Sequence, residues 1–162
     1  MTLDLFAYAC LAIGLSSALV GGVFQAFSDF VMAGLVRATP SGGMDSMQQI
    51  NRTVFRSVFL AMLLALVPVM LAASVAAWQV ADAAARPLVL TGTAIYIVTV
   101  LGVTLFGNVP MNERLDRLPR DGSDAQAYWH TYGIVWTRWN HVRTLGSVSA
   151  AICFLLAALA VA

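Results

Sequence analysis

The chain has 162 residues, of which 60% are hydrophobic and only 10% are charged, and its formal net charge is +1. An average soluble domain carries about 25% charged residues, so this chain has too few charges to cover a surface that faces water on all sides. Its length and composition predict a single membrane domain. The small net charge gives no sign of nucleic acid as a partner.

Four apolar runs are long enough to cross a bilayer as helices, which takes about 20 residues each. We expect these spans at about residues 5–28, 57–81, 87–107 and 144–162. They predict an all-α, membrane-spanning four-helix bundle, a single domain over residues 1–162, whose helices overrun one face of the membrane. The overrun is expected to include a helix extension over about 124–143. It also includes a helix that starts near Asp45 or Ser46 and runs straight into the second span.

The arginines predict the orientation. The segments between spans one and two and between spans three and four carry eight of the nine arginines, and the other side has only Arg86. Positively charged loops stay on the cytoplasmic side, so we expect these segments in the cytoplasm and both chain termini outside, in the inner (cytoplasmic) membrane of the cell. The N-terminal stretch has an acidic residue and no basic one, and we expect a retained membrane helix there rather than a signal peptide.

Residues 128–143, "YWHTYGIVWTRWNHVR", hold three of the four tryptophans and both histidines. At 100° per residue, one helix face carries Trp129, Trp136, Asn140 and Arg143, and Tyr132 lies beside it. Aromatic anchors at the membrane interface are the alternative explanation for the aromatic residues. Anchoring does not require an amide and a guanidinium on the same face, so we expect this face to line a pocket.

The first span contributes a second polar group. Small residues at four-residue spacing predict close packing against a neighbouring helix; they are Gly14, Ala18 and Gly22. The same face continues into Gln25 and Asp29. A carboxylate near the membrane boundary is costly, so we expect Asp29 to face the bundle and to pair with an arginine such as Arg52, Arg56 or Arg143. A purely structural ion pair is the alternative role.

The third span ends in "GNVPMNERL", where Pro110 is expected to stop the helix and leave Asn108 and Asn112 free to point inward. All four helices then bring polar side chains to one level. The expected catalytic residues are Asp29, Arg143, Asn140 and Asn108. The expected substrate-binding residues are Trp136, Trp129, Gln25, Asn112, Arg52 and Tyr132.

A metal site is not expected. His130 and His141 are eleven residues apart, which is roughly 16 Å along a straight helix, so they cannot both bind one metal ion. A haem or metal protein of the bundle type stays as an alternative.

The motifs "FSDFVMAGL", "MQQINRTVF", "GNVPMNERL" and Trp136-x-x-x-Asn140-x-x-Arg143 resemble, in this order, the anthrone oxygenase-like family of small four-helix membrane proteins. The resemblance implies oxidation of anthrones to anthraquinones by O2, without a metal or organic cofactor. Such chemistry needs a base, donors for a developing oxyanion and an apolar aromatic pocket. Asp29 or a histidine would be the base. Arg143, Asn140 and Asn108 would be the donors, and Trp136 and Trp129 would stack on the ring.

The sequence also leaves a non-catalytic function open. A small-ligand binding protein, or an accessory subunit of a larger membrane complex, needs only the packing face of the first span and an interfacial helix. In either case we expect a lipophilic small molecule and membrane lipid as partners. A homo-oligomer and a larger complex both stay open.

Overall fold

The structure is a computed structural model that describes residues 2–81, 83–119 and 122–161. Arg120, one of the arginines behind the expected orientation, lies outside the described residues, as does Ala162 at the end of the expected fourth span.

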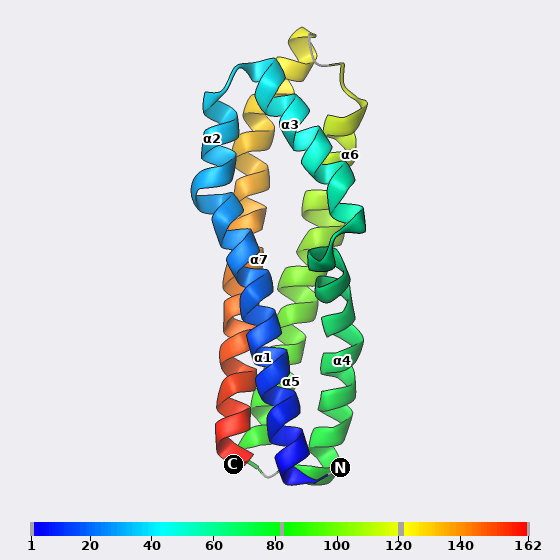
Figure 1. Ribbon diagram of the computed structural model, residues 1–162, viewed down its shortest axis with the longest axis vertical. Coiled ribbons are helices and arrows are strands. Elements are labelled where there is room, and N and C mark those ends of the chain that lie inside the picture. The colour runs from blue at the N-terminus through cyan, green and yellow to red at the C-terminus, as the bar shows by residue number, and fades with distance from the viewer. Residues whose placement is uncertain (1, 82, 120–121, 162) are drawn as a thin grey trace.

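Four long helical rods run side by side and form an all-α bundle (Figure 1). The first rod consists of α1 (Leu3–Ala26), the π-helical segment η1 (Phe27–Val31) and α2 (Met32–Arg37), and the second is α4 (Val58–Val80). The third consists of α5 (Ala85–Ile95), the π-helical segments η3 (Tyr96–Gly102) and η4 (Thr104–Asn108), and α6 (Val109–Arg117). The fourth is α7 (Ser123–Val161), and α2 is joined to α4 through α3 (Pro40–Thr53) and the 3-10 turn η2 (Val54–Arg56).

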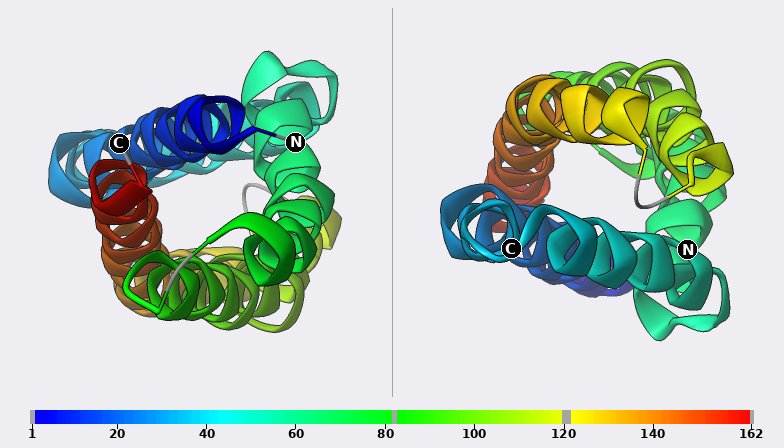
Figure 2. Two further views of the ribbon diagram at one scale, coloured as in Figure 1. Left: turned by 90° about the horizontal axis from the view of Figure 1, so that it is seen from below. Right: turned by 90° about the horizontal axis from the view of Figure 1, so that it is seen from above.

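The rods follow one another around the bundle in the order α1, α4, α5, α7 (Figure 2). Both chain termini lie at one end of the bundle (Figure 1). The opposite end is built from α2, α3, α6 and the first turns of α7, and we call it the polar end.

Each rod is long and apolar enough to cross a membrane, with 35, 23, 33 and 39 residues in chain order. Large apolar side chains such as Leu19, Val75 and Leu159 are exposed on the outer surface, where they suit a lipid environment. The protein is therefore a membrane protein. At 1.5 Å per residue α7 is about 58 Å long, nearly twice the hydrocarbon core of a bilayer, so the bundle extends beyond that core.

The second rod does not begin as expected. Helix α3 starts at Pro40, a residue type that suits the first turn of a helix, and not at Asp45 or Ser46. The helical path then breaks at Ser57, whose backbone is extended (φ −95°, ψ 147°). The Ser57 hydroxyl accepts a hydrogen bond from the Leu60 N–H at 3.1 Å and caps α4. The expectation of one straight helix into the second span is wrong, because this serine starts a new helix.

Pro110 does not stop the third rod, so that expectation is also wrong. Pro110 lies in the first turn of α6, directly after the π-helical η4. A proline is tolerated in a first turn, where its missing N–H has no helical partner to lose. The change from π-helical to α-helical turns supplies such a position inside a continuous rod.

The first rod packs closely on α7 through small residues. A Cβ on Gly14 would come within 2.8 Å of Leu155 Cγ, and one on Gly21 within 3.2 Å of Ser147 Cβ. The Ser17 hydroxyl donates to the carbonyl of Ser147 at 2.9 Å.

The packing face thus holds Gly14, Ser17 and Gly21, whereas Ala18 and Gly22 are exposed. The expected face is wrong beyond Gly14. An α-helix advances about 100° per residue, so eight residues leave the starting face by about 80° and seven by only about 20°.

Gly43 allows α3 to cross the polar end at close range. A Cβ at this position would overlap the carbonyl oxygen of Leu35 and lie 3.1 Å from Trp129 Cζ2. We expect Gly43→Ala to lower the free energy of unfolding by about 1–3 kcal/mol, because a backbone oxygen cannot rotate away. Chemical unfolding in detergent measures this. Gly34→Ala is the matched control: Gly34 is exposed with nothing near its Cβ position. An equal loss in both variants would contradict the close approach.

Candidate functional site

A cavity of about 550 Å³ opens at the polar end. Its size lies within the range of small-molecule sites, about 300–1,000 Å³. Much of the wall is apolar and comes from α1, η1 and the start of α4, as with Phe24, Phe27 and Leu63. The other wall residues are largely polar: Gln49, Asn51, Arg52, Thr53, Ser57, Thr104, Asn108, Asn112, Glu113, Asp116, Asn140 and Arg143.

Arg143 forms the buried side of this cavity and is only 6% exposed. Its Nη2 donates to Asn140 Oδ1 at 2.5 Å, and its Nη1 lies 3.4 Å from Thr104 Oγ1. Its Cζ lies 4.2 Å from the ring centroid of Phe24 and 5.4 Å from that of Trp136. Neither of the two ion pairs found among the described residues involves Arg143. Burial of a cation without an opposite charge beside it costs free energy. Here neutral hydrogen-bond partners and aromatic ring faces surround the guanidinium instead.

Two buried polar atoms on the cavity wall lack a hydrogen-bond partner among the described residues, Arg143 Nε and Asn108 Oδ1, whereas the Asn51 side chain interacts with the Tyr132 hydroxyl. The orientation of the Asn108 amide is fixed by its Nδ2, which donates to the carbonyl of Trp136 at 3.2 Å. Each unsatisfied buried group costs about 1–3 kcal/mol. One donor and one acceptor are therefore available to a molecule in the cavity.

Asn140 positions Arg143 and also ties α7 to the first rod. Its Nδ2 donates to the carbonyl of Phe24 at 2.5 Å and to Ser28 Oγ at 2.6 Å, where the chain enters the π-helical η1. Both contacts turn the Oδ1 of this fully buried amide toward the guanidinium. The side chain is thus restrained from both sides.

Three aromatic rings of α7 form a continuous stack. The ring centroids of Trp129 and Tyr132 are 5.7 Å apart, and those of Tyr132 and Trp136 are 5.9 Å apart, with interplanar angles of 16° and 21°. Asn112 Oδ1 accepts from the Tyr132 hydroxyl at 2.7 Å and from Trp136 Nε1 at 2.8 Å. Trp136 lines the cavity, whereas Trp129 and Tyr132 are buried behind it. The direct ring contact expected of Trp129 and Tyr132 is therefore not supported.

Gln25 and Asp29 do not face the bundle, which corrects the expectation for both. Both are exposed, and Asp29 takes part in neither of the ion pairs of the described residues. Contacts with Asn140 turn Phe24 and Ser28 toward α7, which leaves the neighbouring positions outside. The two histidines, His130 and His141, are exposed as well, so none of the expected bases lines the cavity.

Two carboxylates that the sequence interpretation missed lie at the exposed side of the cavity, which we call the mouth. Asp116 Oδ1 pairs with Arg52 Nη2 at 2.8 Å, and Glu113 Oε2 pairs with Arg117 Nη2 at 3.3 Å. Both carboxylates and Arg52 line the cavity. All four side chains are at least 42% exposed, so these ion pairs are screened by water and contribute little stability.

The signal for the missed carboxylates was present in the sequence. Thr104, Asn108, Asn112 and Asp116 follow one another at four-residue spacing, and all four line the cavity. Neighbours at this spacing lie about 40° apart on an α-helix, so the row turns only slowly around a helix that continues through Pro110. The expected stop at Pro110 hid that row.

A metal centre finds no support in the described ranges: no three His, Cys, Asp or Glu side chains there are grouped so that they could hold a metal ion.

Comparison with known families gives one match. A family model described as anthrone oxygenase matches residues 51–153, about two thirds of the chain. The matched region includes Asn108, Asn112, Trp136, Asn140 and Arg143. No curated protein matches the chain, and no solved structure does.

The double acceptor role of Asn112 is testable by stability. Asn112→Leu leaves the Tyr132 hydroxyl and Trp136 Nε1 without an acceptor, so we expect a loss of about 2 kcal/mol or more in the free energy of unfolding. Asn112→Asp keeps an acceptor oxygen and is the matched control. In a double-mutant cycle, we expect Tyr132→Phe to lower the free energy of unfolding by less in the Asn112→Leu background than in the wild type. Strict additivity would show that the two side chains do not interact.

Proposed function

The chain belongs to the anthrone oxygenase family, and from this premise we propose that it is a membrane-embedded oxidoreductase that oxidises a lipophilic aromatic ketone of the anthrone class to the corresponding quinone in the polar-end cavity. The observation that carries the proposal is the buried Arg143, which reaches the cavity without a carboxylate partner among the described residues. A site with an unpaired cation and apolar walls suits a flat ring that becomes negatively charged at one oxygen.

The chemistry begins with loss of a proton from the ring CH2 group, which turns the ketone into an enolate. Arg143, whose Nε is unpaired, stabilises the charge that develops on the ketone oxygen. The electron-rich enolate carbon reacts with O2, and the CH2 group becomes a second carbonyl. One oxygen atom of O2 ends in that carbonyl, and the other leaves as water with the two hydrogens of the CH2 group. As the family resemblance implies, we propose that no metal or organic cofactor takes part.

Glu113 is our candidate for the proton acceptor. It replaces Asp29 and the histidines, which lie on the outer surface. Asp116 is closely paired with Arg52 at 2.8 Å, whereas the ion pair of Glu113 with Arg117 is longer, at 3.3 Å. Glu113 follows Thr104, a contact of Arg143, by nine residues, about 13 Å along the helix. The proton therefore travels from the ring CH2 group to Glu113 through water at the mouth. The exposed carboxylates keep this mouth polar.

The location of the cavity fits this substrate class. A lipophilic ring reaches it from the bilayer, while the charged mouth stays in contact with water. The arginine distribution supports a polar end on the cytoplasmic side of the inner membrane, with both termini outside.

The first test is Arg143→Gln with anthrone as the substrate, in nanodiscs. O2 uptake and the absorbance of the anthraquinone product report turnover. We expect kcat/KM to fall by about 100-fold or more, because a donor to the developing oxyanion is lost. Arg86→Gln is the matched control: Arg86 also lies over an aromatic ring, 4.7 Å from the Trp78 centroid, and donates to the Ala81 carbonyl, but does not line the cavity.

Undiminished turnover in a folded Arg143→Gln protein would refute the assigned role of Arg143. Stoichiometric binding of anthrone without any turnover by the wild type would favour the non-catalytic binding protein.

The second test separates the two carboxylates at the mouth. We expect Glu113→Gln to lower kcat by about 100-fold with little change in KM, since a general base is lost and the ring contacts remain. Asp116→Asn is the comparison variant and is expected to retain most of the activity. The reverse order of the two effects would assign the proton to Asp116.

A further inference from the structure

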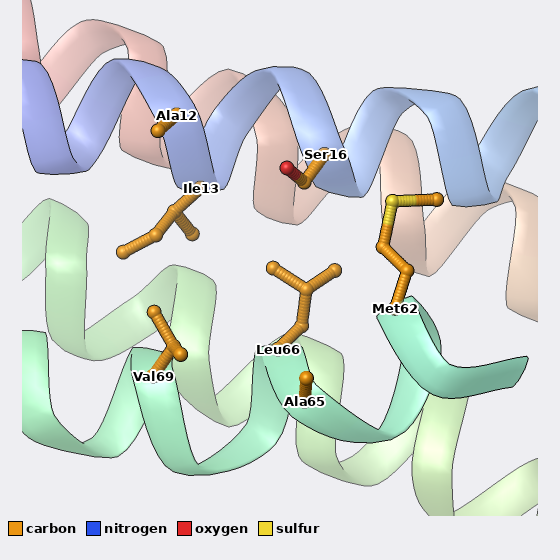
Figure 3. Close-up of a pocket in the computed structure, with 7 residues that line it drawn as sticks. All are labelled: Ala12, Ile13, Ser16, Met62, Ala65, Leu66 and Val69. Atoms are coloured by element: carbon orange, nitrogen blue, oxygen red, sulfur yellow. The ribbon is translucent and has the colours of Figure 1, made fainter. Parts of the chain in front are cut away.

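A second cavity, of about 210 Å³, lies between α1 and α4, away from the polar end (Figure 3). Its lining residues are almost all apolar: Ala12, Ile13 and Ser16 on α1, and Met62, Ala65, Leu66 and Val69 on α4. We call it the α1–α4 groove. Ser16 supplies the one hydroxyl of this lining, so the groove suits an apolar occupant.

Small side chains keep the groove open on the outer surface of the bundle. Ala12 lies on α1 opposite Val69, and Ala65 lies on α4 opposite Ser16 (Figure 3); both alanines have little volume and are exposed. On its other side α1 packs tightly on α7, where Gly14 meets Leu155. The bundle is thus closed between α1 and α7 and hollowed between α1 and α4, on a surface that faces lipid.

The groove and the polar-end cavity adjoin each other along α4. Phe59, Leu60 and Leu63 line the polar-end cavity, while Met62 and Leu66 line the groove. The two linings share no residue, but on α4 they lie within one helical turn of each other. Met62 stands at the end of the groove nearer the start of α4, and its side chain reaches toward α1 (Figure 3).

Met62 and Phe59 lie three residues apart on one face of α4, and both are only half-buried. A methionine is unbranched and has three rotatable bonds, so it adapts its shape to a neighbour at low cost. On the α4 side, the residues between the two cavities are the adaptable Met62 and Phe59, whose ring packs edge-on against Phe24 with the ring centroids 5.5 Å apart. On α1, the buried Val20 lies in the sequence between the two linings.

We propose that the ligand of this protein is a two-part molecule, whose oxygenated ring occupies the polar-end cavity and whose aliphatic or isoprenoid tail passes Phe59 and Met62 into the α1–α4 groove. The inference rests on the proposed function, because it takes the polar-end cavity as the ring site. From Phe59 to Val69 the path is about 15 Å along α4. The polar site lies at the end of the bundle and the apolar groove lies within the spans. In a bilayer, the oxygenated ring and the tail of such a molecule lie at the same two depths.

The test compares two probes with the same naphthoquinone ring: menadione, which has no tail, and phylloquinone, which has a phytyl tail. Quenching of tryptophan fluorescence measures their affinities in nanodiscs of one lipid composition. Ala65→Phe fills the groove. Ala72→Phe is the matched control, since Ala72 is exposed on the same helix two turns further on and lines neither cavity.

We expect Ala65→Phe to weaken phylloquinone binding by about fivefold or more and to leave menadione within about twofold of the wild type. Ala72→Phe is expected to change neither affinity. Ser16→Leu narrows the groove from the α1 side and replaces Ala65→Phe if that variant does not fold.

Three outcomes would overturn the inference. An equal effect on both probes, or no effect on either, would show that the tail does not enter the groove. A phospholipid that native mass spectrometry finds on the wild type but not on Ala65→Phe, with an unchanged ratio of the two affinities, would make the groove a lipid site. Failure of both probes to bind a wild type that still turns over anthrone would also overturn the inference, whereas failure to bind together with no anthrone turnover would refute the ring site, and with it the proposed function.

Discussion

The polar end is organised around a buried positive charge that has no opposite charge beside it among the described residues. Such a cation is tolerated only where dipoles and ring faces replace its water. Asn140 and Trp136 supply these from α7, Phe24 supplies a ring from α1, and Thr104 supplies a hydroxyl from the third rod. One guanidinium therefore fixes the relative positions of three of the four rods at the level of the cavity.

Local departures from the α-helix make this arrangement possible. At η1 the carbonyl of Phe24 is available to Asn140, and at η4 the chain places Thr104 and Asn108 on the cavity wall before it continues through Pro110. π-helical turns often occur at functional sites, because the wider turn frees a backbone group or changes the direction of a side chain. Here they lie where the first and third rods approach Arg143. The Phe24 carbonyl accepts from the Phe27 N–H and also from Asn140 Nδ2.

The sequence predicted what depends on composition and on a regular helical period. The apolar runs indicated the spans, and one face of α7 carried Trp136, Asn140 and Arg143, which with Asn108, Asn112 and Arg52 line a single cavity. The predictions were wrong where the helical period changes from α to π or where contacts between helices decide which side of a helix is buried. The outward positions of Gln25 and Asp29 follow from contacts with Asn140 that no single-helix pattern contains. The carboxylates of Glu113 and Asp116 were missed because a proline was taken as a helix end, whereas tertiary packing and the preceding π-helical turns carry the rod through it.

The depth of each site follows from the cost of its groups in a membrane. A guanidinium at the bilayer centre is expensive, but near the end of the bundle a charged mouth with Arg52, Glu113 and Asp116 lets water reach the cavity. An apolar groove has no such requirement and lies deeper, between α1 and α4. In the proposed function, the ionic chemistry takes place at the membrane boundary, while the apolar surface of the bundle stays in contact with lipid, where both O2 and a lipophilic ring dissolve. A fully soluble protein would have to extract the proposed substrate from the bilayer, whereas a bundle that spans the membrane would bind it there.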